Sequence, residues 1–110
     1  MQLEYTEEAT ADLVDLLDHI ALDSPKRAFS YVGKLREAIE LLQLFPNIGV
    51  ACKTKGIDED CRVLTYESYL IFYVVMVDTV LVKTIIKKTD IIKTTNYDSS
   101  IFYKRTDSIK

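Results

Sequence analysis

Apolar and polar residues follow one another along the first part of the chain with two different periods. Residues 2–6 alternate, with Leu3 and Tyr5 on one side, which predicts a short strand. From residue 7 to residue 22, apolar side chains recur every three or four positions, which predicts a helix with one apolar face. Thr6 is placed to cap this helix at its N-terminus. Another face of the helix, expected to be acidic and solvated, carries Asp12, Asp15 and His19.

A second helical period runs from about residue 25 to about residue 44. Ser24 suits its N-cap, and Pro25 suits the first helical position because the N–H that proline lacks would have no partner there. The connection between the two periods is so short that the helices must pack side by side as an antiparallel hairpin. The sequence Phe-Pro-Asn-Ile-Gly at 45–49 ends the second helix.

After a polar loop at 50–60, three apolar segments at 62–66, 69–76 and 80–86 predict strands. Their connections are short, which favours antiparallel hairpins. The pattern therefore predicts an α+β fold: a short N-terminal strand, an antiparallel helix hairpin and then an antiparallel β-meander. The helices must cover one face of the sheet, because a small sheet cannot bury its apolar side alone.

Length and composition indicate one domain at 1–90. The polar segment 91–110 has no clear periodicity, so it is interpreted as a C-terminal extension whose packing on the domain is left open. No apolar run reaches the roughly 18 residues needed to cross a membrane. The first 20 residues carry six acidic and no basic side chains, unlike a secretory signal. We therefore expect a cytoplasmic protein without a membrane partner.

Charge is divided unevenly along the chain. Residues 1–50 hold 4 Lys and Arg against 9 Asp and Glu, whereas the remaining 60 residues hold 10 against 8. Proteins that bind nucleic acid directly usually carry a strongly basic face. Any such face here must be small and must lie in the second half.

The two cysteines, Cys52 and Cys61, lie in no pattern that is typical of a zinc site. A disulfide between them is geometrically allowed. Because a reducing compartment is expected, we predict two buried or half-buried free thiols instead. No metal or other cofactor is expected.

Four pieces of the sequence together resemble the RelE/ParE superfamily of toxins over about residues 3–90. The first is Tyr-Thr-Glu-Glu-Ala at 5–9 with Asp-Leu at 12–13, and the second is the Ser-Pro break at 24–25 with its following apolar positions. The third is Phe-Pro-Asn-Ile-Gly at 45–49. The fourth is Arg-Val-Leu at 62–64 followed by Tyr-Leu-Ile-Phe-Tyr at 69–73. The helix pair and the 45–49 turn look most like the ParE branch.

The resemblance implies a toxin of a type II toxin–antitoxin system, bound and neutralised by a small antitoxin that is ParD-like or of another class. ParE-like members inhibit DNA gyrase, whereas RelE-like members cut mRNA on the ribosome. Cleavage by a 2′-OH needs a base, an acid and cations near the phosphate. Where RelE-like enzymes carry such groups, this chain has Leu64, Leu70 and Val74. The sequence therefore favours a gyrase inhibitor that acts by binding.

Candidate site residues follow from these two readings. The basic residues expected to contact the target are Arg62, Lys83, Lys87 and Lys88. If the chain is instead a ribonuclease, the catalytic candidates are Arg62, Lys87, Lys88 and Tyr97. Lysines at strand ends also serve simply to solvate and guard an edge strand. The antitoxin is expected to lay a helix or strand across Tyr31, Leu41 and Leu44. An inactive member that only binds its antitoxin is a third alternative.

Overall fold

The computed structural model describes residues 1–89, so the predicted extension at 91–110, with Tyr97, lies outside the described part of the chain. The elements follow one another as β1 (Gln2–Tyr5), α1 (Glu7–Ala21), α2 (Pro25–Glu40), the 3₁₀ turn η1 (Leu41–Gln43), β2 (Val50–Ala51), the 3₁₀ turn η2 (Cys52–Lys55), β3 (Arg62–Tyr66), β4 (Tyr69–Val75) and β5 (Thr79–Lys87).

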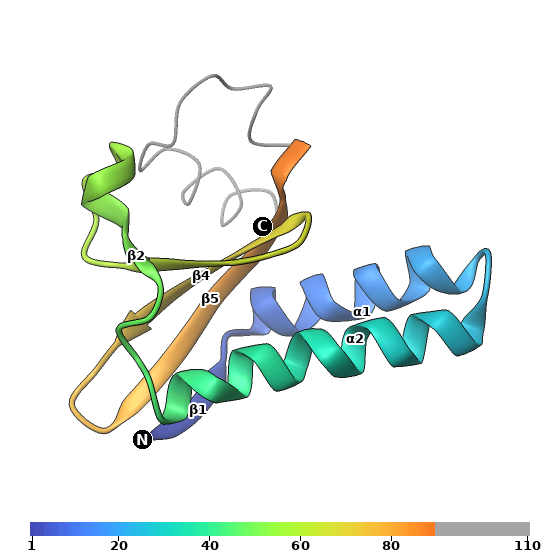
Figure 1. The fold of residues 1–110 in the computed structure, drawn as a ribbon, viewed down its shortest axis with the longest axis horizontal. Coiled ribbons are helices and arrows are strands. Elements are labelled where there is room, and N and C mark those ends of the chain that lie inside the picture. The colour runs from blue at the N-terminus through green and yellow to red at the C-terminus, as the bar shows by residue number, and fades with distance from the viewer. Residues whose placement is uncertain (90–110) are drawn as a thin grey trace.

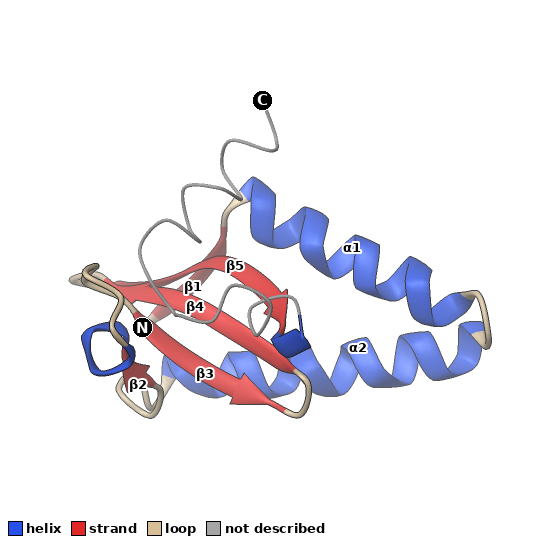
Figure 2. Cartoon of the chain, turned by 90° about the horizontal axis from the view of Figure 1, so that it is seen from above, coloured by secondary structure: helices blue, strands red, loops and turns tan. Residues whose placement is uncertain are grey.

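The sheet has five strands in the order β1-β5-β4-β3-β2. β3, β4 and β5 form the predicted antiparallel meander, and β1 adds to β5 in parallel at one edge. α1 and α2 form an antiparallel hairpin on one face of the sheet (Figures 1 and 2). The predicted α+β fold is confirmed, with the central β4 flanked on both sides by other strands.

Both predicted helix caps form. The Thr6 hydroxyl accepts a hydrogen bond from the Ala9 N–H at 3.0 Å, and the Ser24 hydroxyl accepts one from the Arg27 N–H at 3.2 Å. The second helix ends at Glu40 rather than near residue 44, and the chain continues as η1. The α conformation is disfavoured just before proline, and a tightened 3₁₀ turn is a common way to end a helix ahead of Pro46.

The two faces of β4 belong to two separate apolar clusters. Tyr69, Ile71 and Tyr73 face the helices and pack with their apolar stripes. Leu70 and Phe72 face the other way and pack with the segment that follows β2. Successive side chains of a strand point to opposite faces of the sheet. The continuous apolar run at 69–76 therefore predicted a strand that is covered on both faces, as β4 is.

The segment at 50–60, predicted to be a loop, contains β2 and η2. β2 pairs with β3 over only two residues, Val50 opposite Val63 and Ala51 opposite Arg62. The prediction of free thiols is wrong, because Cys52 and Cys61 form a disulfide with their Cα atoms 5.3 Å apart. The β2–β3 pairing brings the two ends of the intervening segment within disulfide range. The sequence-based prediction rested on the expected compartment, which does not determine this geometry.

Candidate functional site

The turn at 45–49 is fixed by two side chains from the sheet. The Tyr73 hydroxyl donates to the Pro46 carbonyl at 2.7 Å and accepts from the Gly49 N–H at 3.0 Å. Burial raises the pKa of Tyr73, while its bond to Gly49 and the nearby Arg62 act in the opposite direction. Arg62 Nη1 donates to the carbonyls of Asn47 and Gly49 at 3.2 and 2.6 Å. The guanidinium that the sequence singled out as a target contact therefore also holds this turn.

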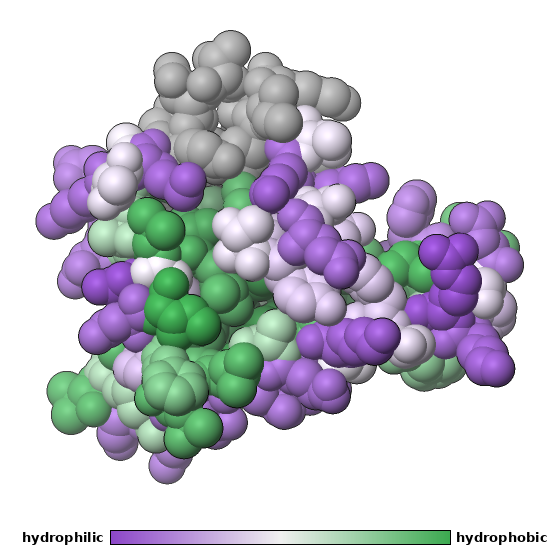
Figure 3. All heavy atoms as spheres, viewed as in Figure 1, coloured by the Kyte–Doolittle hydropathy of each residue, from purple (hydrophilic) through white to green (hydrophobic). Residues whose placement is uncertain are grey.

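Large apolar side chains of this turn and of the segments around it are exposed at one end of the molecule. The Met1 ammonium donates a hydrogen bond to the Gln43 carbonyl of η1. The Gln2 N–H donates one to the Asp78 carbonyl in the β4–β5 hairpin. Figure 3 shows the resulting apolar surface at the lower left. We call it the apolar end, and it consists of Met1, Leu41, Leu44, Phe45, Ile48, Val50, Met76 and Val77.

The apolar end includes two of the three residues predicted to bind an antitoxin. Leu41 is 48% exposed and Leu44 is 73% exposed. Tyr31 lies elsewhere, because ten residues of helix correspond to about 15 Å along the axis. The structure therefore separates the predicted set into the apolar end and a second position on α2.

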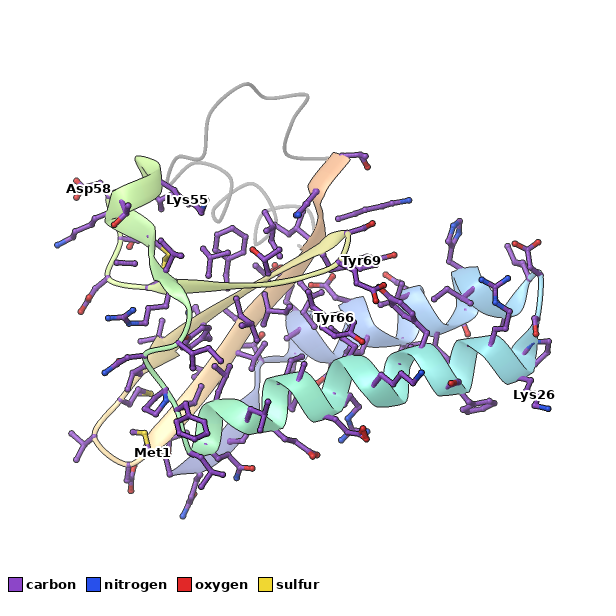
Figure 4. All side chains as sticks on the ribbon, in the orientation of Figure 1. Met1, Lys26, Lys55, Asp58, Tyr66 and Tyr69 are labelled. Atoms are coloured by element: carbon purple, nitrogen blue, oxygen red, sulfur yellow. A yellow bond between two sulfur atoms is a disulfide. The ribbon has the colours of Figure 1, made fainter. Side chains whose placement is uncertain are left out.

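Tyr31 packs against two tyrosines of the β3–β4 hairpin, edge-on to Tyr66 and tilted to Tyr69. Its ring centroid lies 6.0 Å from that of Tyr66 and 6.2 Å from that of Tyr69. Tyr66 and Tyr69 point toward the helix layer in Figure 4. Burial, followed by the hydrogen bond to Glu67, raises the pKa of Tyr31 to about 12. Glu67 itself occupies the hairpin turn with a φ of 50°.

The raised pKa of Tyr31 predicts a loss of stability in alkali. Unfolded tyrosine releases its proton near pH 10, whereas folded Tyr31 holds it to about pH 12. Between these values the unfolded state has lost a proton that the folded state keeps, so stability falls as pH rises. We expect the urea midpoint of Tyr31→Phe to fall less between pH 9 and pH 12 than that of the wild type. Equal pH dependence in the two proteins would contradict the assignment.

The predicted basic residues do not come together. Arg62 is opposite Tyr73, which in turn is opposite Val82. Lys87 is opposite Tyr69 at the other end of the same strands, about four residues or roughly 13 Å further along. The Lys88 N–H bonds the Ser68 carbonyl at that same end. Arg62 is therefore separated from the lysine pair.

Lys83 lies between these two ends. Phe72 is opposite Thr84 and Tyr73 is opposite Val82, which leaves Lys83 as an extra residue in β5. This shift lets Val82 and Ile85, three positions apart, both join the cluster that faces the helices. An extra residue of this kind re-aims side chains on either side of it.

The three positions at which this chain lacks the catalytic groups of RelE-like enzymes are occupied by packing residues. Leu70 is 1% exposed, and Val74 packs against the same cluster on the sheet face opposite the helices. Leu64 packs against the core between helices and sheet. His19 is exposed, as predicted, and lines a cleft of about 270 Å³ together with Asp15, Tyr69 and Lys87, among other residues.

Asp12 is the residue that the sequence analysis placed wrongly. It is 8% exposed rather than solvated, and its Oδ2 accepts from the Thr84 hydroxyl and the Ile85 N–H, both at 2.9 Å. β1 ends its pairing at Tyr5 opposite Val82, so beyond that point this edge of β5 needs other partners. Asp12 supplies one of them.

Thr6 supplies another of these partners. Its N–H donates to the Val82 carbonyl at 3.0 Å and its hydroxyl donates to the Lys83 carbonyl at 2.7 Å. One sequence signal could have revealed Asp12: it lies three residues after Ala9 and four before Leu16, on the buried face of α1. The start of α1 therefore continues the edge of the sheet where β1 stops.

Among residues 1–89, no three His, Cys, Asp or Glu side chains are grouped so that they could share a metal ion. No helix in that part of the chain is long and apolar enough to span a membrane.

Two helices in an antiparallel hairpin cover one face of a five-stranded sheet, and this arrangement defines the class of fold (Figure 1). The family model described as ParE toxin of type II toxin–antitoxin system, parDE, matches residues 3–92. The chain therefore belongs to the ParE toxin family. A solved structure from the chromosomal ParDE TA system of P. aeruginosa is 26% identical with a TM-score of 0.67, covering 79% of this chain and 95% of that chain. No curated protein matches significantly.

Proposed function

We propose that this ParE-family chain acts in the cytoplasm by binding DNA gyrase and inhibiting it, and that a small cognate antitoxin, ParD-like in the first instance, neutralises it. The observation that carries the choice of binding over RNA cleavage is the separation of Arg62 from Lys87 and Lys88. Phosphate cleavage requires cations and proton donors within reach of one reacting group. In the described residues, these cations lie at opposite ends of the sheet.

Lys83, Lys87 and Lys88 are the proposed gyrase contacts, with Arg62 contributing through the turn that it holds. Lys87 is exposed at the end of β5, where a side chain can change without disturbing the core. A surface charge acts mainly on the rate and specificity of association. These residues are therefore suited to orient the toxin on an acidic region of its target.

Gyrase assays test the proposal directly. Purified protein in excess is expected to block supercoiling by gyrase and to increase cleaved DNA, while mRNA in a translating extract stays intact. The variant Lys87→Ala with Lys88→Ala is expected to need roughly tenfold more protein for the same inhibition, with an unchanged melting temperature. Lys26→Ala, at an exposed position on α2, is the matched control. Unchanged supercoiling, or cleavage of mRNA that depends on Arg62, would overturn the proposal.

The apolar end is the proposed binding site of the antitoxin. Exposed apolar surface of this extent usually marks an interaction site, and burying each large side chain contributes about 1.5–3 kcal/mol. An antitoxin helix can insert its own apolar side chains between Leu41 and Leu44 and the neighbouring turn. Tyr31 remains a proposed second contact, nearer the start of α2.

Charge on the apolar end tests this placement. Leu41→Asp with Leu44→Asp is expected to weaken antitoxin binding by a hundredfold or more, because each acidic side chain would be buried without a partner, at a cost of about 2 kcal/mol or more. Isothermal titration calorimetry measures the change. Phe29→Asp is the control, since Phe29 is 70% exposed but lies at the other end of α2. Equal losses for the two variants would exclude the apolar end as the docking site.

A further inference from the structure

The disulfide closes a segment that covers the sheet face opposite the helices. Cys52 is 0% exposed, Cys61 is 7% exposed, and Ile57 between them is 1% exposed. These residues pack with Val63 and Phe72 of the sheet in one apolar cluster. Asp58 is exposed and lies on the outer side of this segment in Figure 4. The disulfide therefore holds a mostly polar segment in place by its few buried side chains.

The same disulfide is linked through β2 and Arg62 to the turn at 45–49, which forms part of the apolar end. Cys52 directly follows β2, and its N–H donates to the Cys61 carbonyl at 2.8 Å. Cys61 directly precedes Arg62, which holds the carbonyls of Asn47 and Gly49. β2 has only two residues paired with β3, so the disulfide, Arg62 and the hydrogen bonds of Tyr73 to the turn contribute much of what keeps this edge in register. Order in the 52–61 segment is thus coupled through one short strand to Ile48 and Val50 of the apolar end.

We propose that Cys52 and Cys61 are a thiol–disulfide exchange site whose redox state sets the order of the 45–61 region, and through it the affinity of the apolar end for its partner. The co-reactant is a small dithiol, or a dithiol protein of the cytoplasm. One of its thiolates attacks a cysteine sulfur, the S–S bond breaks, and the second thiolate resolves the mixed disulfide. This chain gains two electrons and two protons, and the dithiol becomes a disulfide.

The attack proceeds by local opening, since both cysteines are buried in the closed state. Lys53, Thr54, Gly56, Asp58 and Asp60 are all exposed, so the apolar contacts that opening this segment removes are those of Ile57 and the two cysteines. Cys61 keeps slightly more exposed surface than Cys52, 7% against 0%, and is therefore the proposed first target of the attacking thiolate. Once reduced, the segment is no longer a closed loop, and its open state gains the conformational freedom that the cross-link removed.

Limited proteolysis tests the exchange without any partner. Trypsin is expected to cleave after Lys53 and Lys55 at least tenfold faster in dithiothreitol than in the oxidised protein, as read by mass spectrometry after denaturation and reduction. Cys52→Ser with Cys61→Ser is expected to be cleaved at the reduced rate in both conditions. Equal cleavage of oxidised and reduced wild type overturns the proposal, whatever the function of the protein.

A glutathione assay tests which of the two cysteine sulfurs is more accessible. With oxidised glutathione, Cys52→Ser is expected to form a mixed disulfide at Cys61 at least severalfold faster than Cys61→Ser forms one at Cys52, since Cys61 is the more exposed of the two. The intact mass of each variant over time reports the rate. The opposite order overturns the assignment of Cys61 as the sulfur reached first.

Partner binding tests the coupling, which rests on the proposed function. Oxidised protein is expected to bind a ParD-like antitoxin roughly tenfold more tightly than reduced protein, and the double serine variant is expected to match the reduced form. Equal affinity of the two states, with proteolysis still redox-dependent, overturns the coupling alone. If neither state binds the antitoxin or inhibits gyrase while proteolysis responds to dithiothreitol, the proposed function fails and the exchange site stands.

Discussion

Replacing Asp12 with alanine is expected to lower the free energy of unfolding by about 3 kcal/mol, because hydrogen bonds to a carboxylate contribute about 1.5–3 kcal/mol and the donors left behind are buried. The two donors are the Thr84 hydroxyl and the Ile85 N–H, and Thr84 is only 1% exposed. Neither finds another acceptor once the carboxylate is gone, since β1 does not reach that part of β5. Urea denaturation followed by circular dichroism measures the change.

Two further variants show whether the loss comes from these hydrogen bonds. Asp15→Ala removes an exposed carboxylate from the same helix and is expected to change stability by less than about 0.5 kcal/mol. Asp12→Asn keeps one acceptor oxygen and removes the charge, so it is expected to lose about half as much as alanine. If Asp12→Ala and Asp15→Ala had the same small effect, Asp12 would have no part in joining α1 to β5.

Asp12 also shows why a sequence pattern can place a residue wrongly. The periodicity of apolar residues correctly predicted both helices, their caps and the three strands of the meander, because these features depend on neighbours close in sequence. An aspartate was assigned to the solvent by its charge. Its burial depends on the unpaired edge of β5, which lies 72 residues away in the chain. Only the folded structure shows that the Thr84 hydroxyl and the Ile85 N–H donate to this carboxylate.

The candidate site residues differ in the same way, because some depend on local sequence and others on contacts between distant segments. Leu41 and Leu44 could be recognised as exposed apolar residues on a helix pattern, and the structure confirms their exposure. Arg62 was identified within a motif, but its bonds to the carbonyls of Asn47 and Gly49 depend on a turn more than ten residues away. Sequence spacing likewise could not show that β2 returns Cys52 to Cys61. Periodicity could not determine the contacts between segments that are distant in sequence.

Gly49→Ala is expected to destabilise the protein by about 3 kcal/mol, since overpacking costs about 1–3 kcal/mol and a buried hydrogen bond is strained as well. A Cβ at position 49 would stand 2.6 Å from the Tyr73 Oη, 2.8 Å from its Cε1 and 2.8 Å from the Val63 carbonyl oxygen. Tyr73 cannot move aside, because it is 0% exposed and bonds the Pro46 carbonyl. The melting temperature and the affinity for the antitoxin are both expected to fall, since the turn forms part of the apolar end.

Gly33→Ala is the matched control, with the opposite expected sign. Gly33 lies within α2, and a Cβ there would meet nothing within 4 Å, so alanine is expected to stabilise the helix by about 0.5–1 kcal/mol. A double-mutant cycle then isolates the contact at the turn. Tyr73→Phe removes the hydroxyl that the new Cβ would strike, so adding it to Gly49→Ala is expected to cost less than the sum of the two single losses. Strict additivity would mean that the close approach of the Tyr73 hydroxyl is not what excludes a Cβ at position 49.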